Sequence, residues 1–298
     1  MKHIYVIRSS RISLIKHLFN HFRQVNGYKT HVIDIKNVKD LEQYYNSIQS
    51  GSVKYIVFSN GTDNIDKQIY QKCLELNPNQ EFLFSENAWL TWQNYIYLDP
   101  NGIGNLSELF SFTKQDVADY SIDKTKVELC TKTARNLLSI GTKLTDRNYI
   151  LVPLQVDNDS KLLVGSPFFK KVSEFVSYMI DTTPNDINIF FKNHPHNKNK
   201  CPIPKKQNVY DITMAKYSKE SLINNSLYVA GINTTFLIES MFLNHSTVTY
   251  GLDVFSNKDI IVEGYSKSVD EIIKYEINTE IRNKFLEILM SRQVKKVQ

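Results

Sequence analysis

The stretch at residues 149–196 constrains the fold of this chain more than any other. It opens with an apolar run at 149–154, which stops at Gln155 and is followed by polar residues. An amphipathic run at 168–180 comes next, and a second apolar run at 187–191 then ends in Lys-Asn-His-Pro-His. This order predicts strand, loop, helix, strand and loop. Because open α/β sheets bind ligands at the carboxyl ends of their strands, we expect a functional site where these two strands end.

Strand and helix patterns alternate along the whole chain. Predicted strands lie at residues 4–7, 31–35, 55–58, 82–84, 149–154, 187–191, 209–211, 227–230 and 247–250. Predicted helices lie at residues 14–22, 41–48, 65–76, 113–120, 124–138, 168–180, 218–224, 236–243, 268–275 and 278–294. Such alternation is typical of parallel sheets whose strands are joined by helical crossovers.

A polar, turn-rich segment at residues 141–148 interrupts this alternation, and we place a domain boundary there. The prediction is an N-terminal Rossmann-like domain at 1–145 and a C-terminal Rossmann-like domain at 146–298, with the last helix packing back on the N-terminal domain. An aromatic-rich stretch at 87–115 is expected to be a loop. Two consecutive domains of this kind predict an α/β fold of the GT-B type, in which the domains face each other across a cleft. Fold alone does not give function.

Charge and cysteine content exclude several classes of protein. The net charge is +5 and the basic side chains are scattered, which does not indicate nucleic acid binding. The three cysteines lie far apart and are odd in number, which argues against a disulfide framework and fits a reducing compartment. No apolar run approaches the ~20 residues of a transmembrane span. We expect a cytoplasmic protein whose membrane contact, if any, is peripheral; nothing indicates an oligomeric state.

The segment Gly-Ile-Asn-Thr-Thr at residues 231–235 lies between a predicted strand and a predicted helix. The free N–H groups and the dipole at a helix start favour a phosphate. Thr234 and Thr235 can add hydroxyl donors, and Asn233 lies in the same turn. Glu239 follows one helical turn later, where its carboxylate could accept hydrogen bonds from ribose hydroxyls. The alternative is an ordinary N-capped helix with an exposed glutamate.

A second candidate motif, Lys192-Asn-His194-Pro195, follows the strand at 187–191. Pro195 pushes His194 toward extended backbone geometry, from which the imidazole can donate to a phosphate while Lys192 adds positive charge. His196 is a further candidate. The spacing of these residues does not indicate a metal site, because no carboxylate or cysteine accompanies them at ligand spacing.

Carboxylates follow strands in both predicted domains. Asp157 and Asp159 come directly after the strand at 149–154, and alternation along an extended segment would put both on one side. Glu86 ends a strand of the first domain. Two carboxylates flanking one sugar are the usual requirement of glycosyl transfer chemistry. The alternative is that the two aspartates are solvated loop carboxylates.

Several segments together resemble the capsule polysaccharide synthesis family. They are LVPLQVDNDS at 151–160, FFKNHPH at 190–196, GINTTFLIESMFLNHSTVTYG at 231–251, SENAW at 85–89 and LDPNGIGNLS at 98–107. The best-understood members of that family are retaining β-Kdo transferases of bacterial capsule and lipopolysaccharide assembly.

This resemblance implies a CMP-Kdo donor, a saccharide or glycolipid acceptor, and retention through a covalent sugar–enzyme intermediate. It implies Asp159 as the nucleophile, Glu86 as the catalytic glutamate of the first domain, and His194 as the residue that meets the CMP phosphate. No cofactor or metal is implied. The candidate CMP-sugar site comprises Gln155, Lys192, His194, Asn233, Thr234, Thr235 and Glu239.

Two other functions remain open from the sequence. Inverting CMP-sialic acid transferases of bacteria also use a His-Pro motif, but they pair it with an acidic motif in the first domain, where this chain has Asn-Gly-Thr-Asp at 60–63. The second alternative is a non-catalytic, sugar-nucleotide-binding assembly subunit, in which Asp159 and Glu86 would be dispensable. The configuration of the product distinguishes the first alternative, and turnover distinguishes the second.

Overall fold

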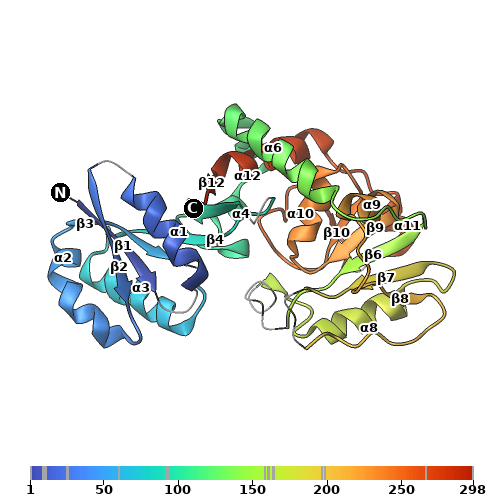
Figure 1. Ribbon diagram of the computed structural model, residues 1–298, viewed down its shortest axis with the longest axis horizontal. Coiled ribbons are helices and arrows are strands. Elements are labelled where there is room, and N and C mark those ends of the chain that lie inside the picture. The colour runs from blue at the N-terminus through green and yellow to red at the C-terminus, as the bar shows by residue number, and fades with distance from the viewer. Residues whose placement is uncertain are drawn as a thin grey trace. The chain divides into compact units, whose positions relative to one another are not determined.

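The chain forms two compact units in a computed structural model (Figure 1). Unit 1 comprises Met1–Ala88, Trp92–Glu108 and Arg292–Gln298, and unit 2 comprises Trp89–Thr91 and Leu109–Ser291. The structure describes residues 2–8, 12–24, 27–59, 61–90, 94–157, 159, 162, 165–195, 197, 199–265 and 267–296.

The main division falls after residue 108 rather than near 145 as expected. The predicted helices at 113–120 and 124–138 therefore belong to unit 2, where they appear as α5 (Lys114–Asp119) and α6 (Lys124–Leu138). A short helix that was not predicted, α4 (Glu108–Ser111), lies at the division itself.

Unit 1 is built on a six-stranded sheet of order β12-β5-β4-β3-β1-β2. Four of its strands are parallel and joined through helices, as the sequence alternation predicts. These strands are β1 (Lys2–Arg8), β2 (Tyr28–Asp34), β3 (Val53–Phe58) and β4 (Glu81–Asn87). The helical segments between them are α1 (Ile12–Arg23), η1 (Val38–Tyr44), α2 (Tyr45–Gln49) and α3 (Asn64–Leu76). Alternate strand residues such as Ile4 and Val6 pack with Leu14 and Leu18 of α1 to form a buried core.

Two strands of unit 1 were not predicted. The expected aromatic loop contains β5 (Tyr95–Asp99), followed by the short η2 (Gly104–Leu106), and the expected final helix gives way at its end to β12 (Gln293–Lys295). Both strands run antiparallel to their neighbours, and Tyr97 pairs with Glu86 on one side and Gln293 on the other. Tyr95, Ile96 and Tyr97 are all buried, so these aromatic residues fill a sheet rather than a loop.

Unit 2 contains a second six-stranded sheet, of order β11-β10-β9-β6-β7-β8, and all of its strand pairs are parallel. Its strands are β6 (Tyr149–Pro153), β7 (Asn188–Lys192), β8 (Val209–Asp211), β9 (Ser226–Gly231), β10 (Thr247–Thr249) and β11 (Val262–Glu263). Its later helices are α8 (Val172–Thr182), α9 (Lys219–Asn224), α10 (Thr235–Phe242), α11 (Val269–Ile273) and α12 (Thr279–Arg292). The prediction of two Rossmann-like domains is confirmed.

The central strand β6 is buried at every residue. Ile150 and Val152 pack with residues of α8 and α11 in one core, and Tyr149 on the opposite side stacks on Phe190 with ring centroids 4.1 Å apart. A strand covered by helices on both faces must be apolar throughout, and this explains the uninterrupted apolar run in the sequence. The polar residues that follow the run therefore lie at the carboxyl edge of the sheet.

Two buried cations link segments of unit 2 that are distant in sequence. Arg282 of α12 donates from Nε to the carbonyl of Ile260 at 2.7 Å and from Nη1 to that of His245 at 3.0 Å. The Lys258 ammonium donates to the carbonyls of Phe110 and Ser256 at 3.1 and 3.0 Å.

Within the described residues, no helix combines the length and apolar character needed to cross a bilayer.

Lys258 makes stability depend on pH. Burial lowers the pKa of Lys258 to about 8, whereas a lysine in the unfolded chain titrates at about 10.4. Between these values the unfolded chain binds more protons, so the free energy of unfolding rises as pH increases. We expect the free energy of unfolding of the wild type to rise with pH relative to that of a Lys258→Met variant, by at most about 1.4 kcal/mol per pH unit. Urea unfolding from about pH 7.5 to about pH 9.5 measures this difference. A matched change at exposed Lys274 should show no such gain. If the difference in free energy of unfolding between wild type and Lys258→Met does not change with pH, the prediction is wrong.

Candidate functional site

Three adjacent strands of unit 2 bring several predicted site residues to one edge. Strands β9, β6 and β7 are neighbours in the sheet and run in the same direction, so their carboxyl ends lie together. The backbone N–H of Leu154 donates to the carbonyl of Lys192 at 2.9 Å. The side chain of Gln155 donates from Nε2 to the carbonyl of Asn233 at 3.1 Å. Gln155 is buried, so it joins the loop after β6 to the turn after β9.

Asn233 shapes the turn that starts α10. Its φ of 51° lies in the left-handed region, which asparagine tolerates better than most residues. Its side-chain amide lies between two glycines: a Cβ on Gly165 would come within 2.5 Å of Nδ2, and a Cβ on Gly251 within 2.3 Å of Oδ1. Asn233 is also buried. The structure thus gives this residue a packing role in the turn.

Thr234 and Thr235 open α10, as predicted. Thr234 is the N-cap residue, and its hydroxyl accepts a hydrogen bond from the N–H of Phe236 at 3.4 Å. Thr235 is the first residue of the helix and is partly exposed. A helix start at the carboxyl edge of a parallel sheet offers backbone N–H donors and a favourable dipole to an anion.

Glu239 is not the exposed glutamate of an ordinary capped helix. It is buried, and both of its carboxylate oxygens accept hydrogen bonds from the Lys219 ammonium, at 2.6 and 2.7 Å. Burial raises the pKa of Glu239, while the charge and hydrogen bonds of Lys219 act in the opposite direction. The sequence analysis missed Lys219. A signal was present, since a carboxylate within the apolar helix sequence TFLIESMF needs a cationic partner when it is buried.

Lys192 lies at the end of β7 and is half-buried. Its ammonium donates to the carbonyl of Ala215 at 3.3 Å. Burial lowers the pKa of Lys192, and the nearby positive charge of Lys219 lowers it further, while Asp211 acts in the opposite direction. Lys192 and Lys219 therefore bring two positive charges near one another at this edge.

The loop that carries His194 is anchored by its neighbour Asn193. The buried Asn193 side chain donates to the carbonyl of Cys201 at 3.1 Å and accepts from the N–H of Cys201 at 2.9 Å. The N–H of Asn193 donates to the Thr213 hydroxyl at 3.0 Å. His194 itself is partly exposed, while His196 lies outside the described residues. Asn193 thus fixes the start of the loop that carries His194.

Asp157 and Asp159 occupy different settings. The carboxylate of Asp157 accepts a hydrogen bond at 2.8 Å from the N–H of Val172, the first residue of α8. The backbone N–H of Asp159 donates to the carbonyl of Val156 at 2.9 Å, which makes this segment a turn. The expected extended geometry, and with it the argument that both side chains lie on one side, is therefore wrong. Asp157 anchors the loop to a helix start, and Asp159 follows it, partly exposed.

Glu86 belongs to unit 1 and lies near the end of β4, where it is buried. Its Oε1 accepts a hydrogen bond from the N–H of Asn87 at 2.8 Å. Lys296 donates to Oδ1 of Asn87 at 3.0 Å, and its charge also interacts with Glu86. Burial lowers the pKa of Lys296, and the Glu86 charge opposes that shift. The C-terminal segment thus supplies a cation beside Glu86, and no local pattern predicts this neighbour.

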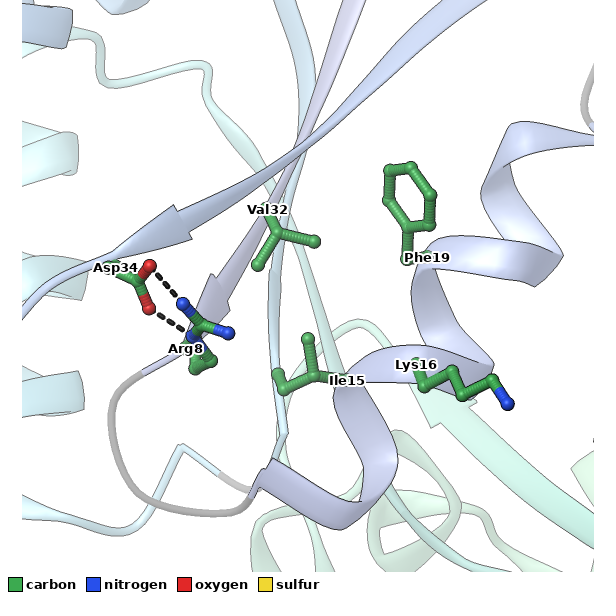
Figure 2. Close-up of a pocket in the computed structure, with 6 residues that line it drawn as sticks. All are labelled: Arg8, Ile15, Lys16, Phe19, Val32 and Asp34. Atoms are coloured by element: carbon green, nitrogen blue, oxygen red, sulfur yellow. Dashed lines mark hydrogen bonds and ion pairs between the residues drawn. The ribbon is translucent and has the colours of Figure 1, made fainter.

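A hollow of about 330 Å³ lies between α1 and strands β1 and β2 of unit 1 (Figure 2). Its polar groups are the paired side chains of Arg8 and Asp34 together with Lys16. Phe19 contributes an aromatic ring from α1. A hollow of this size, with a few polar groups and apolar walls, is within the range of small-molecule sites. Within the described residues, no group of three or more histidine, cysteine, aspartate or glutamate side chains is arranged to hold a metal ion.

Comparisons with known proteins agree with this architecture. A sequence model of a family described as "Capsule polysaccharide biosynthesis protein" matches residues 114–266, slightly more than half of the chain. The matched region contains every candidate residue of unit 2 and excludes Glu86. No curated protein sequence matches the chain.

Two solved structures from Thermosulfurimonas dismutans share the fold. The chain is similar to KpsC described as a beta Kdo 2,7 transferase, with 15% identity, a TM-score of 0.59, and coverage of 98% of this chain and 90% of that one. It is also similar to KpsC described as a beta Kdo 2,4 transferase, with 14% identity, a TM-score of 0.61, and coverage of 98% and 91%. At these identities the similarity shows a common fold over nearly the whole chain.

Proposed function

The chain belongs to the capsule polysaccharide biosynthesis protein family, and from that membership we propose that it is a retaining glycosyltransferase that moves Kdo from CMP-Kdo to a saccharide or glycolipid acceptor. The observation that carries the proposal is the carboxyl edge of the unit 2 sheet. There, Lys192 and Lys219 lie near one another, and Lys219 reaches Glu239 in the second turn of α10. The shared fold with two solved structures described as β-Kdo transferases supports the choice of sugar.

The positive groups at this sheet edge are suited to neutralising the charge of the leaving phosphate. When the glycosyl bond of CMP-Kdo breaks, CMP leaves as a phosphate monoester, and negative charge grows on its oxygens. Fixed cations, an imidazole and the start of a helix stabilise such charge without needing to reorganise. In our proposal Lys192, His194 and the first turn of α10 supply these groups, while Asn233 and Gln155 hold the turn in shape.

Retention requires two displacements at the anomeric carbon. In the first, a carboxylate oxygen of Asp159 attacks that carbon, the bond to the phosphate oxygen breaks, and CMP departs. In the second, an acceptor hydroxyl attacks the same carbon, its proton passes to Glu86, and the bond to Asp159 breaks. Each step inverts the centre, so the product keeps the configuration of the donor.

We assign the acceptor to unit 1, which carries Glu86 and the hollow beside α1. Arg8 and Asp34 could hydrogen-bond to sugar hydroxyls there, and Phe19 could pack against a sugar face. A glycolipid acceptor would bring the protein to the membrane surface as a peripheral enzyme on the cytoplasmic side, where nucleotide-activated sugars are consumed.

The direct test is to supply CMP-Kdo and CMP-sialic acid in separate reactions with a saccharide acceptor and to measure released CMP. We expect release from CMP-Kdo above the rate of spontaneous hydrolysis, and little from CMP-sialic acid. Release should persist in EDTA, because cationic side chains are proposed to take the role that a metal plays in other transferases. Release from CMP-sialic acid alone would favour an inverting sialyltransferase. Activity lost in EDTA and restored by magnesium or manganese would contradict the proposed route.

A further inference from the structure

The Lys219–Glu239 pair joins two elements at the proposed donor site. Lys219 is the first residue of α9, and Glu239 lies in the second turn of α10. The two side chains differ in exposure: that of Glu239 is 7% exposed and that of Lys219 is 36% exposed. The carboxylate is therefore enclosed, while the lysine that binds it remains open to solvent or to a ligand.

The position of Lys219 is well defined. Its helix is capped by Ser218, whose hydroxyl accepts from the N–H of Ser221 at 3.2 Å, and the N–H of Ser218 donates to the carbonyl of Thr142 at 2.8 Å. The Lys219 ammonium lies 5.0 Å from the ring centroid of Phe236, the second residue of α10. The charge is thus held beside the first turn of the helix whose start faces the proposed phosphate.

Counting donors shows what this ammonium can still bind. A lysine ammonium has three N–H donors, and two of them bind the oxygens of Glu239. A ligand that bound the third N–H would leave the pair intact. Glu239 would then act as a positioning residue that fixes the ammonium in place, since a carboxylate bound by two hydrogen bonds restrains an otherwise flexible side chain.

The balance of charge at this edge also favours an anion. Lys192 and Lys219 carry two positive charges, and Glu239 neutralises one of them. Asp211 is a further carboxylate near Lys192, but it is exposed, and its Oδ1 accepts a hydrogen bond from the N–H of Thr213 at 2.9 Å. A phosphate bound between the two lysines would neutralise the positive charge that Glu239 leaves uncompensated.

We propose that Lys219, held by Glu239, binds the phosphate of the donor nucleotide together with Lys192. This inference rests on the proposed function, since it gives the CMP site of that function a second lysine. It predicts that Lys219 contributes to binding a nucleoside monophosphate and contributes nothing to binding the nucleoside alone.

The test is isothermal titration calorimetry of the full chain with CMP and, separately, with cytidine. Lys219→Met should weaken CMP binding about ten- to a hundredfold, as expected for the loss of a hydrogen bond between two charged groups. Cytidine binding should stay within about twofold of wild type. Lys219→Arg should recover part of the loss, because it keeps the charge but not the geometry. Lys216→Met, at an exposed lysine in the preceding loop, should change neither affinity.

A double variant distinguishes a loss of CMP binding from a loss of folding. Lys219→Met leaves Glu239 buried without its partner, whereas Lys219→Met with Glu239→Gln removes both charges and should restore thermal stability. The double variant should show the same selective loss of CMP affinity. Equal CMP affinity in wild type and variants would overturn the inference, as would a parallel loss of CMP and cytidine binding in a folded variant. Failure of the wild-type protein to bind CMP would instead contradict the proposed function.

Discussion

Asp159→Asn is expected to lower turnover on the order of 10⁴-fold while leaving the fold and CMP affinity near wild type. Asparagine keeps the shape of the side chain but cannot form the covalent bond to the sugar, so the two-step route is lost. The measurement is the rate of CMP release from CMP-Kdo in the presence of acceptor, with thermal unfolding to confirm the fold.

Asp157→Asn is the matched control for this change. The Asp157 carboxylate accepts from the N–H of Val172 at the start of α8, and the amide oxygen of asparagine can still accept that hydrogen bond. What is lost is the interaction of a negative charge with the helix dipole, about 0.3–1 kcal/mol. Turnover should therefore fall by less than about tenfold. Equal losses in the two variants would indicate that the loop as a whole, rather than Asp159, is required.

His194→Ala is expected to give the second largest effect, with turnover about 10²- to 10³-fold lower and CMP binding at least about tenfold weaker. The reason is that this change removes the imidazole that, in the proposed function, donates to the leaving phosphate. The fold should survive, because the loop is held by Asn193 through its hydrogen bonds to Cys201 and Thr213. Calorimetry with CMP and single-turnover kinetics measure the two effects, and thermal unfolding checks the loop.

Comparing the affinities for CMP and for cytidine again isolates the contribution of the phosphate to binding. His194→Ala should weaken CMP binding and leave cytidine binding unchanged. Unchanged CMP affinity and rate in a folded His194→Ala variant would remove this histidine from the site. A loss of thermal stability as large as the loss of binding would instead assign His194 to the framework of the loop.

The sequence was most informative about unit 2. Buried parallel strands are continuous apolar runs, so the ends of β6, β7 and β9 could be read directly, and with them the polar residues at the sheet edge. Gln155, Lys192 and the start of α10 do lie at that edge. The antiparallel strands β5 and β12 could not be read in this way. β12 has three residues and pairs with β5, which is distant in sequence, and β5 lies in the aromatic-rich segment that was expected to be a loop.

Side-chain pairing was the part that the sequence did not reveal. Nothing local links Lys219 to Glu239 or Lys296 to Glu86, because each pair is brought together by the tertiary fold. The same holds for Asn233, whose packing between two glycines gives it a role in the turn that no local pattern indicates. Periodicity predicts which face of an element is buried, but not which polar groups meet there.

The most direct test of the central claim is intact-protein mass spectrometry after the protein is mixed with CMP-Kdo, using wild type and a Glu86→Gln variant slowed in the second displacement. The account predicts the mass of one added Kdo, and peptide mapping should place it on the peptide that contains Asp159. An adduct on a different carboxylate would assign the nucleophile elsewhere. An α-linked product formed without any adduct would contradict retention through Asp159.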